Sequence, residues 1–324
     1  AAPGETLWIQ PVGDARLGWN EKTWRGQFKV FVNARGKLTL ATRVPLETYM
    51  IGVVPGEIGA LSETLLQAGR AQAIAARSYS LFYRGRRAAE GFDLYGTVED
   101  QVYGPVESER ELATRCVTTT RGELALYDGA PIRANYCSTC GGITADVDEG
   151  WPTPPIPYLV SHRDRRGAQD YCAASPHYRW REEWPAADFV AGVVAQADAE
   201  GIPRPPEVGD LVDTRVLSRT NSGRVWELEV VTSRGVVKVP GYRLRWLLRR
   251  PGNVRSILRS NLIKIDVRRD PATRKALAVV VSGAGSGHGV GLCQTGALGM
   301  ARDRATAEQI LRHYYRGTEI RKLY

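Results

Sequence analysis

Residues 62–86 constrain the fold most, because small side chains recur through a segment with a helical start and end. Ser62 can cap a helix that reaches about Arg84. Small side chains let a neighbouring element approach closely, so we expect this helix to lie at the centre of the fold. Gln72 and Arg77 then need polar partners, unless both face solvent. The small residues are Ala68, Gly69, Ala71, Ala73, Ala75 and Ala76.

The segments around this helix predict a mixed α+β fold. Two alternating apolar runs flank the turn residues 33–36 and predict a β-hairpin. Residues 44–60 then lead into the helix. The later elements are a loop-rich region (141–185), a helix (186–199), a linker (201–210), a β-rich stretch, a glycine-rich segment (282–301) and a last helix capped by Thr306 and Gln309.

The bulk composition is that of a folded protein. The chain has 324 residues, and 43% of them are hydrophobic, enough for one large domain or two intimate ones. No apolar run approaches the roughly 20 residues that a transmembrane helix needs. The first residues, 1–4, resemble a processed end, so we expect an extracytoplasmic protein exported by a signal that this chain does not contain.

The net charge of +9 favours a polyanionic partner such as nucleic acid, anionic lipid or cell wall, or simply reflects heavy use of arginine. A run of five or six like charges is absent from the sequence, which argues against a nucleic-acid-binding arm. We therefore predict no nucleic-acid partner.

Glu57 is the first candidate for chemistry. It follows Pro55 and Gly56 and precedes Gly59, a pattern that indicates a turn between a strand-like run and the central helix. Such a turn can hold a carboxyl group at the rim of a cleft, where apolar neighbours favour the protonated form that a general acid needs. Glu47 is a weaker candidate for the same role. A surface position without function is the alternative for Glu57.

The cysteines are a second candidate site. The chain has five of them: Cys116, Cys137, Cys140, Cys172 and Cys293. An odd number excludes complete disulfide pairing. The C-x-x-C spacing of the second and third can direct two thiolates to one zinc ion. Cys172 and a histidine would complete the set, and His177 is preferred to His162 because it lies five residues after Cys172. A disulfide between Cys172 and one of the pair, or inert thiols, are the alternatives.

The glycine-rich segment GSGHGVGLCQTGA is a third candidate. His288 lies among glycines that would let the backbone approach a ligand closely. Gln294 could bind hydroxyl groups of that ligand. Cys293 lies between them, but without an evident base beside it we do not expect it to be a nucleophile.

Four blocks of the sequence together resemble the SpoIID/LytB family: VPLETYMIGVVPGEI, LLQAGRAQAIAARSYSL, YCSTCGG, and GHGVGLCQTGALGMA followed by ILRHYYRGTEI. They occur in the family's order, and the resemblance extends from about Phe28 to Ile320. It implies a single, crescent-shaped unit over residues 1–324, with a central small-residue helix packed on β-structure. Within that unit, residues 28–185 and 277–324 are expected to form the catalytic core and residues 208–276 a β-rich lobe.

The resemblance also implies an activity on peptidoglycan. In members that act as lytic transglycosylases, the catalytic acid falls on Glu57, so we expect cleavage between N-acetylmuramic acid and N-acetylglucosamine to 1,6-anhydro products. One carboxyl group suffices for that reaction, and it needs no cofactor, because the muramoyl C6 hydroxyl replaces water. The side chains expected to bind the glycan or developing charge are Gln72, Arg77, His288 and Gln294.

The resemblance bears on zinc and on partners as well. Members that hold zinc use cysteine and histidine around the CSTCGG block, where Cys140 fits and Cys137 replaces the usual histidine. A zinc ion held by Cys137, Cys140, Cys172 and His177 would be structural. The expected partners are peptidoglycan strands and a cell-wall amidase or another wall enzyme of division or sporulation. The alternative function is a non-catalytic, wall-binding enhancer of an N-acetylmuramoyl-L-alanine amidase.

Overall fold

The computed structural model describes residues 5–324, so the small-residue stretch interpreted as a processed end lies outside the described residues. The chain divides into two compact units, one made of Ala1–Asn135 with Met300–Tyr324 and the other of Tyr136–Gly299. Both contain helices and small sheets, which confirms the predicted α+β class. Within residues 5–324, the helices are all too short or too polar to cross a membrane.

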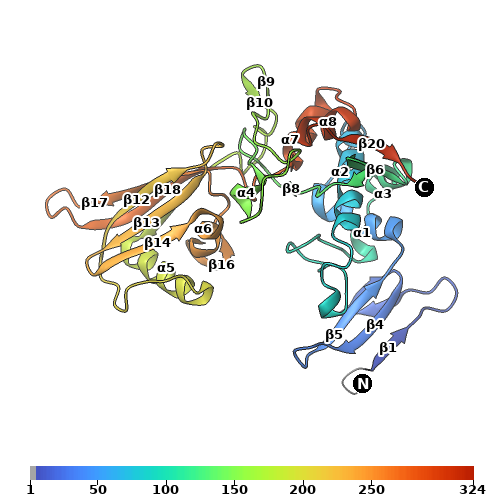
Figure 1. Cartoon of the computed structure of the whole chain (residues 1–324), viewed down its shortest axis with the longest axis horizontal. Helices are drawn as coiled ribbons and strands as arrows, with labels where there is room; N and C mark the ends of the chain where they lie inside the picture. The colour runs from blue at the N-terminus through green and yellow to red at the C-terminus, as the bar shows by residue number, and fades with distance from the viewer. Residues whose placement is uncertain (1–4) are drawn as a thin grey trace. The chain divides into compact units, whose positions relative to one another are not determined.

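The first unit combines small antiparallel sheets with helices (Figure 1). One sheet has the order β1-β4-β5, and its β4–β5 hairpin is the one predicted, with Asn33 Oδ1 accepting the backbone N–H groups of Arg35 and Lys37. Another, β20-β6-β7, joins the two parts of the sequence that form this unit. The elements are β1 (Thr6–Ile9), β2 (Leu17–Trp19), β3 (Lys22–Trp24), β4 (Gln27–Val32), β5 (Leu38–Arg43), α1 (Leu46–Ile58), α2 (Leu66–Phe82), α3 (Glu111–Thr119), β6 (Glu123–Tyr127), β7 (Ala130–Pro131), α8 (Ala307–Tyr314) and β20 (Glu319–Lys322), with 3₁₀ turns at Glu63–Leu65, Ala88–Glu90 and Val106–Ser108.

Helix α2 is the centre of the first unit, as the small residues predict. It packs against α1, α3, α8 and β6, and every residue from Ala71 to Ser80 is buried. At Gly69, a Cβ atom would lie 2.6 Å from the sulfur of Cys116 on α3, so only glycine allows this approach. The predicted start is wrong by one turn: α2 follows a 3₁₀ turn, and the Ser62 hydroxyl hydrogen-bonds to that of Thr64 instead of capping the helix.

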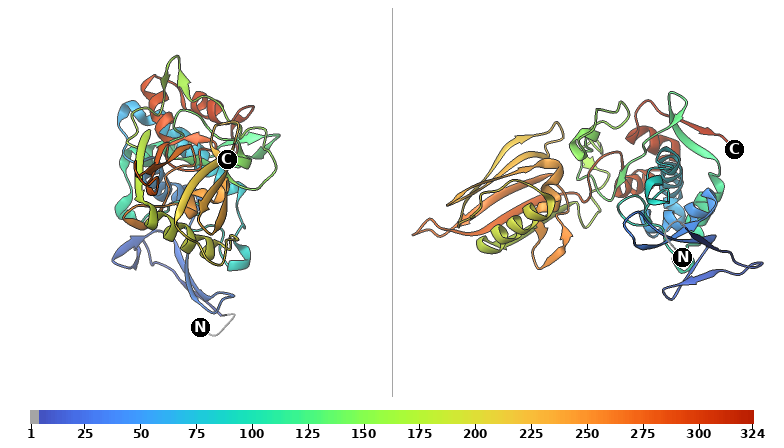
Figure 2. Two further views of the ribbon diagram at one scale, coloured as in Figure 1. Left: turned by 90° about the vertical axis from the view of Figure 1, so that its left-hand side faces the viewer. Right: turned by 60° about the horizontal axis from the view of Figure 1, so that its bottom comes forward.

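The second unit contains two three-stranded antiparallel sheets, β11-β18-β17 and β12-β13-β14. Helix α5 packs on β11 and β18 (Figure 2), and α6 packs on β13 and β14. Apolar side chains of both sheets and both helices form one core. The elements are β8 (Tyr136–Cys137), α4 (Val147–Gly150), β9 (Arg165–Arg166), β10 (Gln169–Asp170), β11 (Arg179–Pro185), α5 (Ala186–Glu200), β12 (Leu211–Arg219), β13 (Val225–Thr232), β14 (Gly235–Pro240), α6 (Gly241–Leu247), β15 (Arg249–Arg250), β16 (Asn253–Ile257), β17 (Ile263–Arg269), β18 (Ala276–Ala284) and β19 (Leu292–Cys293), and α7 (Gln294–Arg302) begins here and ends in the first unit.

Several local predictions agree with these elements. Helix α5 matches the predicted helix of residues 186–199, and α8 begins at the predicted capping box of Thr306 and Gln309. The predicted loop-rich region of residues 141–185 holds only short elements as far as β10, but its last seven residues form the strand β11, which corrects the prediction there. Just before this region, β8 pairs in parallel with β19, which brings the cysteine block beside the glycine-rich segment.

Candidate functional site

Glu57 lies in the last turn of helix α1, and the turn predicted for it from proline and glycine is wrong. Pro55 has no N–H group to donate within a helix, which is why it suggested a break. The helix nevertheless continues to Ile58, and the N–H of Gly104, from another loop, donates a 3.1 Å hydrogen bond to the carbonyl of Gly52. A tertiary contact thus anchors α1 one turn before Pro55.

That same loop, residues 100–104, orients the Glu57 carboxyl. The N–H of Val102 donates a 2.7 Å hydrogen bond to Glu57 Oε1. Two glycines of α1 allow the close approach: a Cβ on Gly52 would lie 2.5 Å from the Tyr103 ring, and one on Gly56 would lie 3.1 Å from the Val102 side chain. Gly56, which suggested a turn, therefore forms with Gly52 the contact face of a helix.

Polar side chains fix the loop itself. Asp100 accepts hydrogen bonds from Arg86 (3.0 Å), Arg87 (3.2 Å) and the N–H of Tyr95 (2.9 Å). Gln101 is fully buried, accepts the Ser80 hydroxyl at 2.7 Å and donates to a carbonyl of α2 at 3.2 Å. Sequence reasoning missed this loop, although an Asp-Gln pair directly before apolar residues is a pattern that could have pointed to it.

Aromatic rings pack beside the loop that contacts Glu57. The rings of Tyr49 and Tyr103 lie 4.9 Å apart, and that of Trp24 lies 5.7 Å from Tyr103. Burial raises the pKa of Tyr49, and the negative charge of Glu57 raises it further. Burial also raises the pKa of Tyr103 to about 12. Both hydroxyls therefore stay protonated near neutral pH and can act as donors.

Arg77 and Gln72, predicted to bind the glycan, are instead completely buried in α2. Arg77 donates from Nε and Nη2 to the Glu47 carboxylate (2.8 and 2.9 Å), and from Nη1 to the carbonyl of Glu123 at 3.0 Å. These positions correct the sequence-based expectation, because side chains enclosed in this way hold the fold together and cannot reach a ligand.

Glu47 also differs from the weaker acid candidate that the sequence suggested. Burial alone would raise the pKa of Glu47, but hydrogen bonds from Arg77 and Tyr324 outweigh burial and lower it below 4.5. Glu47 is therefore an ionised partner of Arg77, and a general acid must be protonated. Glu47 is thereby excluded as the general acid, and the assignment of that role to Glu57 stays a prediction.

His288 and Gln294 lie in the second unit, whereas Glu57 lies in the first. The Nδ1 atom of His288 accepts the N–H of Val290 at 3.0 Å, and its ring packs 4.7 Å from that of Trp151. Gln294 begins α7 and is 8% exposed. The histidine is half-buried and helps to shape its own glycine-rich loop, so a role in binding stays a prediction.

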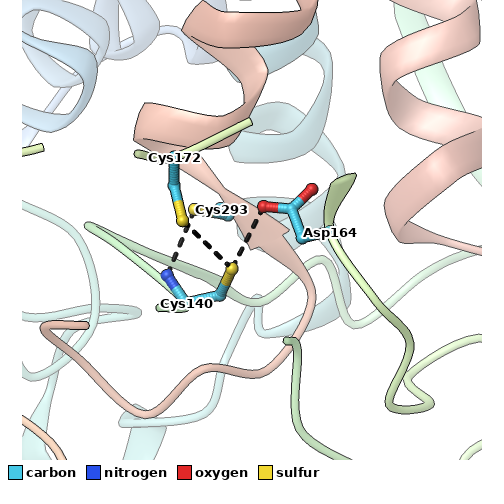
Figure 3. A group of neighbouring side chains, drawn as sticks. All are labelled: Cys140, Asp164, Cys172 and Cys293. Atoms are coloured by element: carbon cyan, nitrogen blue, oxygen red, sulfur yellow. Dashed lines mark hydrogen bonds between the residues drawn. The ribbon is translucent and has the colours of Figure 1, made fainter. Parts of the chain in front are cut away.

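Four buried side chains of the second unit converge as a candidate metal site, shown in Figure 3: Cys140, Asp164, Cys172 and Cys293. One ligand atom from each lies within 4.8 Å of all the others. The Cys140 and Cys172 sulfurs are 3.8 Å apart, and the Cys140 thiol donates to Asp164 Oδ2 at 3.0 Å. The N–H groups of Cys140 and Gly296 both donate to the Cys293 sulfur at 3.2 Å.

The donor set suits a tetrahedral zinc ion. With Zn–S bonds of about 2.3 Å, two sulfurs of a tetrahedron lie about 3.8 Å apart, whereas a disulfide needs about 2.05 Å. The observed 3.8 Å matches the metal geometry. Arg224 is fully buried beside the cluster and donates to the carbonyls of Cys140 (3.0 Å) and Ile143 (3.1 Å), so a positive charge lies close to these sulfurs.

The thiols differ in their electrostatics. Hydrogen bonds from the neighbouring Cys140 and Cys293 lower the pKa of Cys172 to about 4. Burial, in contrast, raises the pKa of both Cys140 and Cys293. Of the three thiols in the cluster, Cys172 therefore loses its proton most readily, and a thiolate is the form that binds a metal ion.

The cluster changes the ligand set predicted from the sequence. Cys140 and Cys172 belong to it, but Cys137 and His177 are outside it. Cys137 lies beside Cys293 in the β8–β19 pair, three residues before Cys140, and residues at this spacing in extended chain point to opposite faces. Burial and the charges of Arg259 and Arg250 lower the pKa of His177. Asp164 and Cys293 were missed because both are far from the motif in sequence.

Comparisons with known proteins agree with these features. Residues 34–127, which include α1, α2 and the loop at Val102, match the family described as SpoIID, Stage II sporulation protein. Residues 168–291 match one described as Domain of unknown function (DUF8618).

Three relatives are similar along most of the chain. Stage II sporulation protein D of Bacillus subtilis (strain 168) is 28% identical over 86% of this chain and 74% of its own length. The protein of that name from Bacillus amyloliquefaciens is 26% identical, again over 86% of this chain and 74% of its own length. The amidase enhancer of Bacillus subtilis (strain 168) is 25% identical over 83% of this chain, which spans 40% of that protein. The predicted resemblance is thereby confirmed: residues 34–127 match the SpoIID family, and proteins named stage II sporulation protein D and amidase enhancer are similar to this chain along most of its length.

Proposed function

We propose that this protein remodels the bacterial cell wall as a lytic transglycosylase, with Glu57 as the single acid and base. The relationship to stage II sporulation protein D and to an amidase enhancer supports a role at the wall. The observation that carries the enzymatic proposal is the 2.7 Å hydrogen bond from the Val102 N–H to Glu57 Oε1. This hydrogen bond orients the carboxyl group against the loop of residues 100–104.

The reaction begins with proton transfer from the Glu57 carboxyl group to the glycosidic oxygen between N-acetylmuramic acid and N-acetylglucosamine. The C1–O bond breaks, N-acetylglucosamine leaves with a free hydroxyl, and positive charge develops at the muramoyl C1. The Glu57 carboxylate then takes the proton of the muramoyl C6 hydroxyl as its oxygen attacks C1. A 1,6-anhydro ring closes, and Glu57 is again protonated.

The surroundings of Glu57 favour this single-carboxyl route over hydrolysis. A hydrolytic glycosidase needs a second carboxylate to activate water or to act as a nucleophile. Asp100, on the loop that contacts Glu57, has no exposed side-chain surface and forms ion pairs with Arg86 and Arg87. The Asp100 carboxylate therefore holds the loop in place through these ion pairs.

The test is the release of anhydro-muropeptides from glycan strands stripped of stem peptides. Glu57→Gln retains an oxygen for the Val102 N–H but has no proton to transfer, so we expect a loss of at least about 10²-fold in rate. Glu63→Gln is the matched control, because Glu63 is 68% exposed in an ion pair with Arg115. The proposal fails if the wild type releases no anhydro products, or if the Glu57→Gln protein releases as many.

The rival function is an enhancer that binds the wall and stimulates an N-acetylmuramoyl-L-alanine amidase without cutting glycan. The name of the amidase enhancer relative favours it. Adding each variant to such an amidase separates the two: stimulation that survives Glu57→Gln, together with absent glycan cleavage, identifies an enhancer.

We also propose that Cys140, Cys172, Cys293 and Asp164 hold a structural zinc ion. All four are buried, and four protein ligands leave no position for a reacting water, so the metal would stabilise the second unit. Comparison of the native with the denatured mass decides: one zinc lost on denaturation supports the site, and two missing hydrogens in the denatured protein indicate a disulfide instead.

A further inference from the structure

The first unit contains a cavity of about 820 Å³ that the proposed chemistry leaves unused. It lies between the strands of residues 8–44, the start of α1, the end of α2 and the segment 91–103. Its volume falls in the range of about 300–1,000 Å³ typical of ligand sites. Its lining residues all belong to the first unit, so the cavity is complete there.

Aromatic rings dominate the lining. Trp8 and Trp19 are 42% and 58% exposed, which is unusual for such large side chains. Trp24 and Tyr103 stack further along, with centroids 5.7 Å apart. The faces of such rings are electron-rich and flat, so they attract the weakly positive C–H groups on one side of a sugar ring and the methyl of an N-acetyl group.

The charges at the cavity favour an anionic ligand. Lys29, Arg43 and Arg84 line it, and the one acidic lining residue, Asp93, accepts a backbone N–H from Gly85. The Arg43 guanidinium lies 5.6 Å from the centre of the Trp8 ring. Muramic acid carries a lactyl carboxylate on each second sugar of a glycan strand, which matches a site with both flat rings and cations.

The cavity also adjoins the environment of Glu57. Tyr49 lines it and lies two turns before Glu57 on α1, and Tyr103 follows Val102, which binds the Glu57 carboxyl. The Tyr49 hydroxyl is buried and has no hydrogen-bond partner among the described residues.

We infer that this cavity binds the stretch of glycan strand next to the bond being cleaved, stacking N-acetylated sugars on Trp8, Trp24 and Tyr103. The inference rests on the proposed function for its substrate class. It adds a separate binding site: the strand is recognised by its sugars and lactyl groups over several residues, and not only at the cleaved bond.

The experiment measures binding of soluble, peptide-free glycan strands by calorimetry to the Glu57→Gln protein with and without Trp8→Ala. Loss of one stacking ring is expected to raise Kd about five- to tenfold. Trp246→Ala is a matched control, since Trp246 is 43% exposed with Arg249 5.8 Å from its ring, but lies in the second unit. In the active protein, which retains Glu57, Trp8→Ala should raise KM for long strands and leave kcat nearly unchanged.

The outcomes separate this inference from the proposed function. If the wild type does not cleave glycan but Trp8→Ala still weakens binding, the enzyme proposal fails and the binding site stands. If the wild type cleaves, and Trp8→Ala matches Trp246→Ala in Kd and KM, the binding site fails alone. Absence of glycan binding to the Glu57→Gln protein, or an effect of Trp8→Ala only on peptide-bearing fragments, also overturns the inference.

Discussion

Substituting the glycines of α1 tests how the catalytic carboxyl is positioned. A Cβ atom at Gly52 would lie 2.5 Å from Tyr103 Cε2, against about 3.5–4.0 Å for an ordinary carbon contact. The ring, and the loop that carries it, must therefore move by roughly 1 Å. Such overpacking costs about 1–3 kcal/mol, of which the better helix propensity of alanine offsets about 1 kcal/mol. We expect Gly52→Ala to lose up to about 2 kcal/mol of unfolding free energy.

The effect on activity should be larger than the effect on stability. Moving Val102 by 1 Å breaks its hydrogen bond to Glu57, and a misplacement of this size can lower a rate about 10²-fold. Gly56→Ala should be milder, because its Cβ would meet Val102 at 3.1 Å and a shift of a few tenths of an ångström relieves the contact. Gly192→Ala on α5 is the control, since no atom lies within 4 Å of its added Cβ.

The assay combines urea unfolding, the rate of anhydro-product release and hydrogen exchange at the Val102 amide. Both the rate and the protection of the amide should be highest in Gly192→Ala, lower in Gly56→Ala and lowest in Gly52→Ala. Equal rates and equal amide protection for Gly52→Ala and Gly192→Ala would show that the loop does not orient Glu57, and the reasoning would be refuted.

Three further predictions concern buried polar groups. Arg77→Met leaves the Glu47 carboxylate without its ion-pair partner and should lower the free energy of unfolding, measured in urea, by about 3 kcal/mol. Arg312→Met is the control: it removes an exposed ion pair with Glu308 and should cost less than about 0.5 kcal/mol. Similar losses for the two variants would contradict the structural role of Arg77. Folding lowers the pKa of Glu47, so the Glu47 carboxylate stabilises the protein above pH 4.5, its ordinary pKa, and this stabilisation is lost as the pH falls through the lowered pKa. Glu47→Gln should therefore make the unfolding free energy depend less on pH below pH 4.5. The same pH dependence in the wild type and in Glu47→Gln would contradict this. Cys293→Ser and Asp164→Asn should lose zinc in native mass spectra while Cys137→Ser and His177→Ala keep it, and the reverse pattern would restore the ligand set predicted from the sequence.

Elements with local signals could be predicted from the sequence. The hairpin at Asn33, helix α5 and the capping box of Thr306 each depend on residues a few positions apart. The small residues of α2 predicted its central place, because such a helix gains stability only when neighbours pack closely around it. The prediction of a turn at Glu57 was wrong because the helix there is held by a tertiary contact. The local signals from Pro55 and Gly56 were overridden by a loop 45 residues away in sequence, which no local pattern reveals.

The candidate sites could be predicted only in part. The resemblance identified Glu57, but its hydrogen-bond donor at Val102 depends on a tertiary contact. The cysteine motif identified Cys140, whereas Cys293 reaches it through the parallel pairing of β8 with β19, across more than half of the second unit's sequence. The partner of Arg77 also could not be predicted, because the Glu47 carboxylate that it binds lies 30 residues away in sequence on another helix.

The pairing of β20 with β6 has a consequence for biosynthesis. The whole second unit lies between these two strands in sequence. A ribosome that adds about 5–20 residues per second therefore synthesises β20 roughly 10–40 s after β6. During that interval the edge of β6 is open, and the Glu47 carboxylate lacks the hydrogen bond that Tyr324 later donates. The first unit therefore cannot close cotranslationally in one step, and chaperones that shield open strand edges would act on it while the second unit is being made.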